Sequence, residues 1–473
     1  MMIDLYELTM ANGYFVSGVN NRAVFDVFYR RNPDGGGYAI FAGLAQVLEY
    51  LENMHFTKED IDYLRGLQLF HPDFLDFLKD FRFRGDVYAF PEGTVMYPGE
   101  PCLTVVANLI EAQLVETAIL AQINHQSLIA TKAARIVKAA QGRSVADFGA
   151  RRAHNMDAAT YGARAAFIGG VNSTATVSAG QLFNIPLSGT MAHSWVMFFQ
   201  DEFTAFKTYA LLYPKNTTLL VDTYDTLHSG IPNAIRVAKE VLAPRGQRLQ
   251  AVRIDSGDLA WLSKKIRSLL DDAGLTDCKI TASNSLDEFT ISSLLAQGAK
   301  IDSFGVGERL ITAKSEPVFG AVYKLVAVEH DNKFLPRIKI SENPAKISIP
   351  GFKAVHRIFD SSGHAQADLI TLFHEKLSFP CQFVSPYQPW KLRHFHNCTA
   401  TTLTKIFLRG GRRVQPVEPL QLIRHFVNLQ LTNHIWPEEQ RFENPHIHYI
   451  DFSPALWRLK LSLLDNCQLN CFS

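Results

Sequence analysis

The stretch LQAVRIDSGDLAWLSKKIRSLLDDAG, residues 249–274, changes its hydrophobic pattern near the middle. Its first part alternates around the β-branched Val252 and Ile254, which is typical of a strand. From Leu259 onward, apolar side chains recur every three or four positions, as on one face of a helix. The stretch therefore predicts a strand followed directly by a helix, which is one half of a βαβ unit.

The same alternation extends to both sides of this stretch. Further strands are expected within residues 143–149, 186–193, 217–223, 278–284 and 301–310. Helical patterns follow four of them, at residues 158–169, 195–213, 231–243 and 285–299. Because each crossover helix returns the chain to the same end of the sheet, such strands pair in parallel. Six strands in this order predict an α/β barrel in the middle third of the chain.

Polar and glycine residues gather where these strands end. In parallel barrels the functional groups come from the carboxyl ends of the strands and from the loops after them. We therefore expect one rim to carry the following residues: Asp147, Phe148, His193, Asp222, Asp225, Arg253, Asp255, Ser283, Asn284, Gly305 and Gly307.

The segments on either side lack this rhythm. Residues 1 to about 120 mix a helical start with β-rich runs and Pro/Gly turns, and the chain is again β-rich after about Asp331. We assign residues 121–344 to the barrel, and residues 1–120 and 345–473 to a flanking α/β domain. Two domains agree with a length of 473 residues, since single domains mostly run to roughly 100–200.

Composition excludes several classes of protein. Lys plus Arg number 47 and Asp plus Glu 46, so net charge predicts neither a nucleic acid nor a membrane as partner. No apolar stretch approaches the roughly 20 residues that span a bilayer, and the N-terminus does not resemble a signal peptide. The six cysteines are scattered without a CxxC pair, which favours reduced thiols in the cytoplasm.

The motif VRIDSGDL, residues 252–259, carries the strongest chemical signal. Arg253 and Asp255 lie on the same side of the expected strand, because strand side chains alternate. A cation and a carboxylate at a strand end suit a phosphate that carries Mg²⁺, with Asp255 as the candidate metal ligand. The alternative is a structural Arg–Asp ion pair, with Asp258 as the N-cap of the next helix.

Other strand ends offer weaker signals. Gly305 and Gly307 in SFGVGERL can let backbone N–H groups approach a phosphate, although two glycines in a turn usually only turn the chain. Asp222 in VDTYDTLHSG can hold the ring of a histidine, whereas His228 in the same motif can equally be solvated.

Two further motifs suggest room for a ligand. In SGTMAHS, residues 188–194, His193 is surrounded by small side chains. In ADFGARRAH, Phe148 can stack on a flat heteroaromatic ring while Arg151 binds an anionic substituent; alternatively Phe148 belongs to the core and the arginines are solvated.

Two His-x-His pairs lie near the C-terminus. They comprise His394 with His396, and His446 with His448. Alternate residues of a strand face the same side, so each pair is a possible metal site. No carboxylate or cysteine stands at a recognisable spacing, so we do not assign a metal to them.

Taken together, the motifs resemble the nicotinate phosphoribosyltransferase family. The resemblance is carried, in order, by DLYELTMANGY, DFGARRAH, GGVNSTATVSAGQLFNIPLSGTMAHSW, LLVDTYDTLHSGIPNAI, VRIDSGDL, DSFGVGERL and FGAVYKLV. These motifs cover roughly residues 3–330, and KISIPGFKAVHR and ADLI extend the likeness to about residue 370.

The resemblance implies a fold, a reaction and partners. It implies an irregular α/β barrel beside a second α/β domain built from the N- and C-terminal segments, and a homodimer with shared active sites. The reaction joins nicotinate to the phosphoribosyl group of phosphoribosyl pyrophosphate, coupled to ATP hydrolysis in NAD salvage. His193 would accept a phosphoryl group from ATP, Asp222 would orient its ring, and Mg²⁺ would lie near Asp255.

The resemblance also implies the residues that bind the substrates. Tyr6 from the neighbouring subunit and Phe148 would stack on the two faces of nicotinate. Arg151 and Arg253 would bind anionic groups, and the backbone around Gly305 and Gly307 would bind the 5′-phosphate.

One segment departs from the relatives. This chain reads GGVNSTAT, with Asn172 where relatives have an acidic residue and Ala175 where they have a serine. Asn172, Ser173 and Thr174 can donate to a carboxylate, which favours nicotinate over nicotinamide. A nicotinamide-specific enzyme and a barrel that binds a phosphorylated metabolite without catalysis remain the alternatives.

Overall fold

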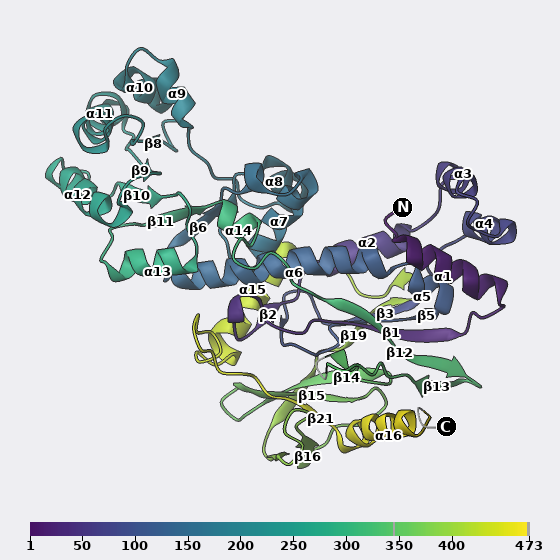
Figure 1. Ribbon diagram of the computed structural model, residues 1–473. Coiled ribbons are helices and arrows are strands. Elements are labelled where there is room, and N and C mark those ends of the chain that lie inside the picture. Colours follow the sequence, from purple (N-terminus) through teal and green to yellow (C-terminus); the bar gives the residue numbers. More distant parts are fainter. Residues whose placement is uncertain (344–345, 471–473) are drawn as a thin grey trace. The chain divides into compact units, whose positions relative to one another are not determined.

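A computed structural model describes residues 1–343 and 346–470 of the chain (Figure 1). The chain divides into two compact units. The flanking unit comprises Met1–Leu128 and Val318–Ser473, and the barrel unit comprises Ile129–Pro317. The expected barrel extended to residue 344, but the chain re-enters the flanking unit earlier. The reason is strand β12 (Val322–His330), which pairs with β1 (Arg22–Phe28) in the flanking unit.

The barrel unit is built on one parallel sheet with the strand order β7-β6-β11-β10-β9-β8. Its strands are β6 (Ser144–Asp147), β7 (Ser173–Thr174), β8 (Thr218–Leu220), β9 (Ala251–Ile254), β10 (Lys279–Ala282) and β11 (Ser303–Val306). The sheet curls but keeps β7 and β8 as its two edges, so it forms a half-barrel. The predicted irregular α/β barrel with parallel pairing is confirmed.

Helices follow the strands, four of them where the sequence predicts. They are α7 (Met156–Ile168), α8 (Val177–Phe183), α9 (His193–Phe198), α10 (Glu202–Leu212), α11 (Ile231–Val237), α12 (Leu259–Asp272), α13 (Glu288–Ala296) and α14 (Glu308–Ile311), after the long α6 (Glu116–Ala139). The buried faces of α12 and α13 carry Ile266 and Ile291, which are fully buried. These helices hold the strand ends in place.

Two local expectations are wrong. The single helix expected at 195–213 is interrupted at Phe199, where the backbone is extended and Asp201 caps α10 by accepting from the Thr204 amide at 2.8 Å. The strand expected at 186–193 is reduced to one bridge between Leu187 and Thr174. The remainder of that segment, SGTMA, is loop that leads to α9.

Both ends of the chain build the flanking unit. One sheet has the order β13-β12-β1-β5-β3-β19-β20, and a second has the order β17-β16-β21-β15-β14-β18. The first comprises β1, β3 (Asp86–Ala89), β5 (Leu103–Asn108), β12, β13 (Lys333–Pro336), β19 (Lys405–Arg409) and β20 (Arg412–Arg413). The second comprises β14 (Lys353–Phe359), β15 (Ala365–Leu372), β16 (Cys381–Val384), β17 (Leu392–Phe395), β18 (Thr399–Thr402) and β21 (Ile450–Phe452).

Helices complete the flanking unit. They are α1 (Leu5–Val16), α2 (Leu44–Asn53), α3 (Lys58–Gly66), α4 (Pro72–Lys79), α5 (Leu109–Gln113), α15 (Leu420–Leu429) and α16 (Pro454–Asn470). A separate two-stranded antiparallel sheet is formed by β2 (Ala39–Ile40) and β4 (Val95–Met96). In the described residues, no helix is long and apolar enough to cross a membrane.

Buried ion pairs join the N- and C-terminal segments. Lys353 of β14 lies 2.8 Å from Asp26 of β1, and both side chains are almost fully buried. Arg357 of β14 binds Asp368 of β15 with two N–H donors at 2.9 and 2.6 Å, and donates to the Val95 carbonyl at 2.8 Å. A buried charge costs free energy unless it is paired, so these contacts fix the register between the two segments.

The structure gives His448 a different role from the metal ligand that the His-x-His pattern allowed. Its Nδ1 lies 3.1 Å from Glu439 and its Nε2 lies 3.5 Å from Asp368, and its ring stacks on Tyr97 at 3.8 Å. In residues 1–343 and 346–465, whose side chains the structure describes, no group of three or more His, Cys, Asp or Glu side chains is arranged to hold a metal. His448 is therefore part of the buried charge cluster.

This cluster predicts a pH dependence of stability. Burial alone would lower the pKa of His448, but Asp368 and Glu439 raise it above its ordinary value of 6.5. A raised pKa stabilises the folded chain below about pH 6.5, and the contribution is lost as pH rises through the folded pKa. Urea unfolding should show a loss of up to about 1.4 kcal/mol per pH unit in that window, which His448→Gln removes. An unchanged slope in His448→Gln would contradict the assignment.

Candidate active site

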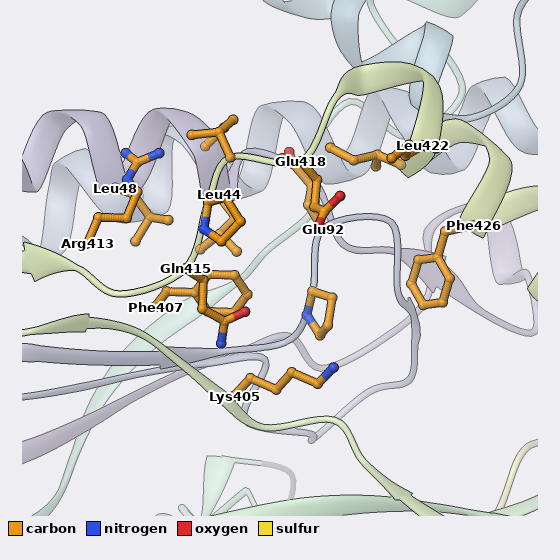
Figure 2. A pocket seen from close by; sticks show the side chains of 15 residues that line it. Leu44, Leu48, Glu92, Lys405, Phe407, Arg413, Gln415, Glu418, Leu422 and Phe426 are labelled. Carbon is orange, nitrogen blue, oxygen red and sulfur yellow. The ribbon is translucent and has the colours of Figure 1, made fainter.

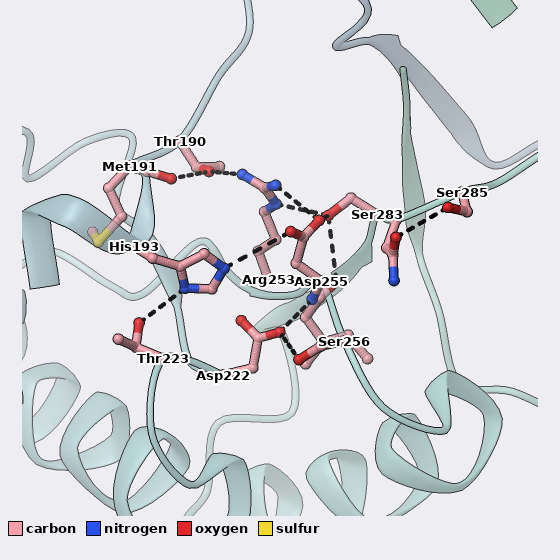
Figure 3. Close-up of polar contacts among 12 residues, drawn as sticks. Thr190, Met191, His193, Asp222, Thr223, Arg253, Asp255, Ser256, Ser283 and Ser285 are labelled. Carbon is pink, nitrogen blue, oxygen red and sulfur yellow. Dashed lines mark hydrogen bonds and ion pairs between the residues drawn. The ribbon is translucent and has the colours of Figure 1, made fainter. Parts of the chain in front are cut away.

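The carboxyl ends of β8, β9 and β10 bring several polar side chains of the barrel unit together (Figure 3). The sequence predicted that Arg253 and Asp255 share one side of β9, and the structure confirms it, with Arg253 Nη2 3.1 Å from Asp255 Oδ1. Both side chains remain partly accessible, at 14% and 26% exposed. The pair is thus available to a ligand as well as to each other.

Arg253 is held by three partners at once. Its Nε donates to Ser283 Oγ at 2.8 Å, and its Nη1 donates to Thr190 Oγ1 at 2.8 Å. Ser283 in turn donates to Asp255 Oδ1. Together with the contact from Nη2 to Asp255, these bonds engage all three nitrogens of the planar guanidinium and fix its orientation.

Phe148 lies next to this guanidinium. The Arg253 guanidinium carbon is 5.4 Å from the centre of the Phe148 ring, which is within the range of a cation–π contact. Gly305 makes room for the ring, because a Cβ at that position would stand 2.4 Å from Phe148 Cε2. A side chain at position 305 would therefore clash with Phe148, which explains the glycine by packing. The phosphate contact expected at Gly305 and Gly307 stays a prediction.

His193 opens helix α9 and points toward Asp255 (Figure 3). Its Nδ1 lies 3.1 Å from Thr223 Oγ1, and its Nε2 lies 3.8 Å from Asp255 Oδ2. The side chain is 40% exposed, and Gly189 has nothing within 4 Å of the position of a Cβ. The small neighbours in SGTMAHS thus leave open space on one side of the loop.

Asp222 does not hold the His193 ring in the way the resemblance implied. Its Oδ2 accepts from the Asp255 amide at 2.8 Å and from Ser256 Oγ at 2.6 Å. The contact to the imidazole comes from the next residue, Thr223. Asp222 instead positions the backbone that carries Asp255, and its Oδ1 is buried with no hydrogen-bond partner among the described residues.

In the segment expected to determine base specificity, residues 172–174, two side chains already make hydrogen bonds within the protein. Thr174 donates to Asp147 Oδ2 at 2.8 Å and accepts from the Thr176 amide at 3.0 Å, so its hydroxyl is not free to bind a carboxylate. Asn172 accepts from the Val145 amide through Oδ1, which leaves its NH₂ group. Ser173 is half-buried, and its hydroxyl makes no hydrogen bond within the part of the chain that the structure describes.

The remaining candidates have structural roles or are exposed. Asp258 caps α12 by accepting from the Trp261 amide at 3.0 Å, as the alternative interpretation held. His228 is exposed and contacts Asp225 at 3.1 Å. Arg151 is exposed after β6, and Tyr6 lies on α1 of the flanking unit, where it is 41% exposed.

Sequence analysis overlooked two hydroxyl residues. Thr190 binds Arg253, as does Ser283, which was expected at the rim, and Thr223 contacts His193. Thr190 lies within one expected strand and Thr223 at the end of another, so their positions were available as a signal. Hydroxyl side chains are common in loops, however, and their partners become evident only when the strands are assembled.

Comparison with known proteins shows the family to which the chain belongs. Residues 143–369 match the nicotinate phosphoribosyltransferase (NAPRTase) family, residues 1–124 its N-terminal domain and residues 352–460 its C-terminal domain. The chain is 47% identical over 467 residues to a Bacillus subtilis nicotinate phosphoribosyltransferase, covering 97% of this chain and 94% of that protein.

Two further relatives agree. A Mycobacterium tuberculosis nicotinate phosphoribosyltransferase, pncB2, is 48% identical over 76% of this chain and 75% of its own. The crystal structure of human nicotinic acid phosphoribosyltransferase superposes with a TM-score of 0.88 at 29% identity, covering 98% of this chain and all of that one. With its half-barrel, its strand-end cluster and these matches, the chain belongs to the nicotinate phosphoribosyltransferase family of enzymes.

Proposed function

We propose that this chain transfers the phosphoribosyl group of phosphoribosyl pyrophosphate to nicotinate, giving nicotinate mononucleotide and pyrophosphate in NAD salvage. The observation that carries the proposal is the cluster of His193, Arg253 and Asp255 at the carboxyl edge of the sheet, in a chain of this family. The oriented guanidinium suits an anionic substrate group. Phe148 beside it offers a flat apolar face for the pyridine ring.

In the transfer step the pyridine nitrogen attacks C1 of the ribose while the C–O bond to pyrophosphate breaks. Charge builds up on the departing pyrophosphate, and positive groups fixed in advance stabilise it without reorganisation. Arg253 is fixed in this way by Ser283 and Thr190. Arg151 and the backbone near Gly305 and Gly307 would bind the remaining anionic groups.

The coupling to ATP uses His193. An imidazole nitrogen attacks the γ-phosphorus, the bond to ADP breaks and an N–P bond forms, which water later cleaves. Because Nδ1 faces Thr223, Nε2 is the nitrogen left for the phosphoryl group. The open space around the SGTMAHS loop would accommodate it.

A magnesium ion fits the donors near His193. Mg²⁺ usually binds one or two carboxylates together with substrate phosphates, and the buried, unpartnered Oδ1 of Asp222 beside Asp255 suits that mode. Asp222 and Asp255 would hold the ion, which would neutralise phosphate charge. The family resemblance further supports a cytoplasmic homodimer in which Tyr6 reaches the partner subunit's base site.

The test is an assay of mononucleotide formation from phosphoribosyl pyrophosphate with nicotinate or nicotinamide, with and without ATP. We expect turnover of nicotinate that ATP stimulates, and a loss of that stimulation in His193→Ala. His228→Ala removes an exposed histidine of the same unit and should leave the stimulation unchanged.

The alternatives give different results in the same assay. Turnover of nicotinamide but not nicotinate would overturn the base preference and retain the chemistry. No turnover with either base would overturn the proposed function in favour of a non-catalytic barrel.

A further inference from the structure

A pocket of about 340 Å³ lies within the flanking unit, formed by α2, β19 and α15 (Figure 2). Small-molecule sites commonly measure roughly 300–1,000 Å³ and are lined mainly by apolar side chains with a few polar groups. All lining residues belong to the flanking unit, so the pocket is not part of the strand-end cluster in the barrel unit.

The walls of the pocket are apolar. Leu44 and Leu48 come from α2, Phe407 from β19, and Leu422 and Phe426 from α15. Figure 2 shows these side chains on separate elements around a common space. Leu422 is 55% exposed, whereas its neighbour Ile423 is buried. An apolar ligand would cover such a surface and stabilise the complex by burial.

Most polar groups of the lining already have partners. Arg413 binds Glu52 with two N–H donors, and Glu92 accepts from the Gly43 amide at 2.6 Å. Gln415 donates to the Ile406 carbonyl at 2.6 Å. These groups shape the pocket but do not need a ligand to satisfy them.

Lys405 differs from the other cation of the lining. Among the residues that the structure describes, its ammonium group makes no ion pair or hydrogen bond, whereas Arg413 is neutralised by Glu52. Glu418 is also unpaired within this described part, but it lies at the opposite side of the pocket in Figure 2. One end of the apolar space thus presents an available positive charge.

We propose that this pocket binds a small apolar molecule bearing one carboxylate, with the carboxylate at Lys405 and the apolar body between α2 and α15. Lys405 is exposed, so its ammonium group can reach a carboxylate at the mouth of the pocket while the apolar walls bury the rest of the molecule. Glu418 at the far side disfavours a second negative charge. The site does not depend on the proposed catalytic function, because it uses none of the residues assigned to it.

Calorimetric titration of the full chain with sodium octanoate, 1-octanol and octylammonium tests the proposal. We expect saturable binding of octanoate with a Kd on the order of 1 mM or tighter, and at least about tenfold weaker binding of 1-octanol. Lys405→Gln should reduce octanoate binding to that of 1-octanol. Lys333→Gln, an exposed lysine at the opposite edge of the same sheet, should leave binding unchanged.

A second pair of variants locates the ligand. Leu422→Glu adds a negative charge at an exposed lining position and should abolish octanoate binding, whereas Leu422→Met should preserve it. Absence of saturable octanoate binding to the wild type would overturn the proposal. Equal octanoate binding by the wild type and Lys405→Gln would also overturn it. Tighter binding of octylammonium than of octanoate would overturn it as well, and would assign the charge preference to Glu418.

Discussion

Replacing Arg357 with methionine is expected to lower the free energy of unfolding by about 3–5 kcal/mol. Arg357 and Asp368 are 3% and 0% exposed, and two hydrogen bonds join them. Burial alone would raise the pKa of Asp368, but Arg357 holds it well below its usual range. Without the guanidinium, the carboxylate would remain buried with its main partner removed. Urea unfolding at constant pH measures the loss.

A double variant tests whether the loss comes from the carboxylate that is left unpaired. Arg357→Met with Asp368→Leu removes both charges, and apolar residues in place of a buried pair often retain stability. We expect the double variant to recover a large part of the loss in Arg357→Met. A single variant that costs less than about 1 kcal/mol would show that the cluster tolerates an unpaired Asp368, and would contradict this account.

The sequence allowed the barrel unit to be predicted well because its signals are local. Each strand is a short buried run that ends in polar residues, and each helix has one apolar face, so the order of elements follows from nearest neighbours. The expected strand at 186–193 failed because its central SGT has no apolar alternation to support pairing. The prediction of one helix at 195–213 failed because Asp201 caps the start of a second helix, although the apolar pattern continues across that position.

The flanking unit was harder to predict because the residues in contact there are far apart in the sequence. Strand β12 pairs with β1 about three hundred positions earlier, and nothing in residues 318–344 alone indicates that partner. Lys353 and Asp26 similarly appear as ordinary charged residues until their strands are assembled. The pair His446 and His448 suggested a metal, whereas the carboxylates that bind His448 come from two other segments.

At the candidate site, residue type and strand-end position were predictable, but individual contacts were not. Arg253 and Asp255 share one side of a strand by simple alternation, and the structure confirms their contact. Asp222 lies at the predicted strand end, but its carboxylate turns to the Asp255 amide, a contact that the sequence did not predict. Such contacts depend on which strand ends become neighbours in the assembled sheet, which no local pattern encodes.

Replacing Arg253 with lysine is expected to reduce kcat/KM for mononucleotide formation by about 100-fold or more, if the proposed transfer is the activity. The guanidinium reaches Ser283, Thr190 and Asp255 at the same time, at 2.8, 2.8 and 3.1 Å. An ammonium has no planar fork, so it cannot keep all three contacts and present a paired donor edge to the substrate. Steady-state kinetics with varied phosphoribosyl pyrophosphate measures the change.

The matched control is Arg248→Lys in the same unit, where Arg248 makes only an exposed ion pair with Asp277. That variant should retain kcat/KM within about twofold, because exposed pairs contribute little. Circular dichroism should show both variants folded, since lysine keeps the charge and the aliphatic stem of Arg253, which is partly buried in β9. If Arg253→Lys kept wild-type kcat/KM, the three contacts would serve only to hold the loops together, and substrate anions would have to be bound elsewhere on the rim.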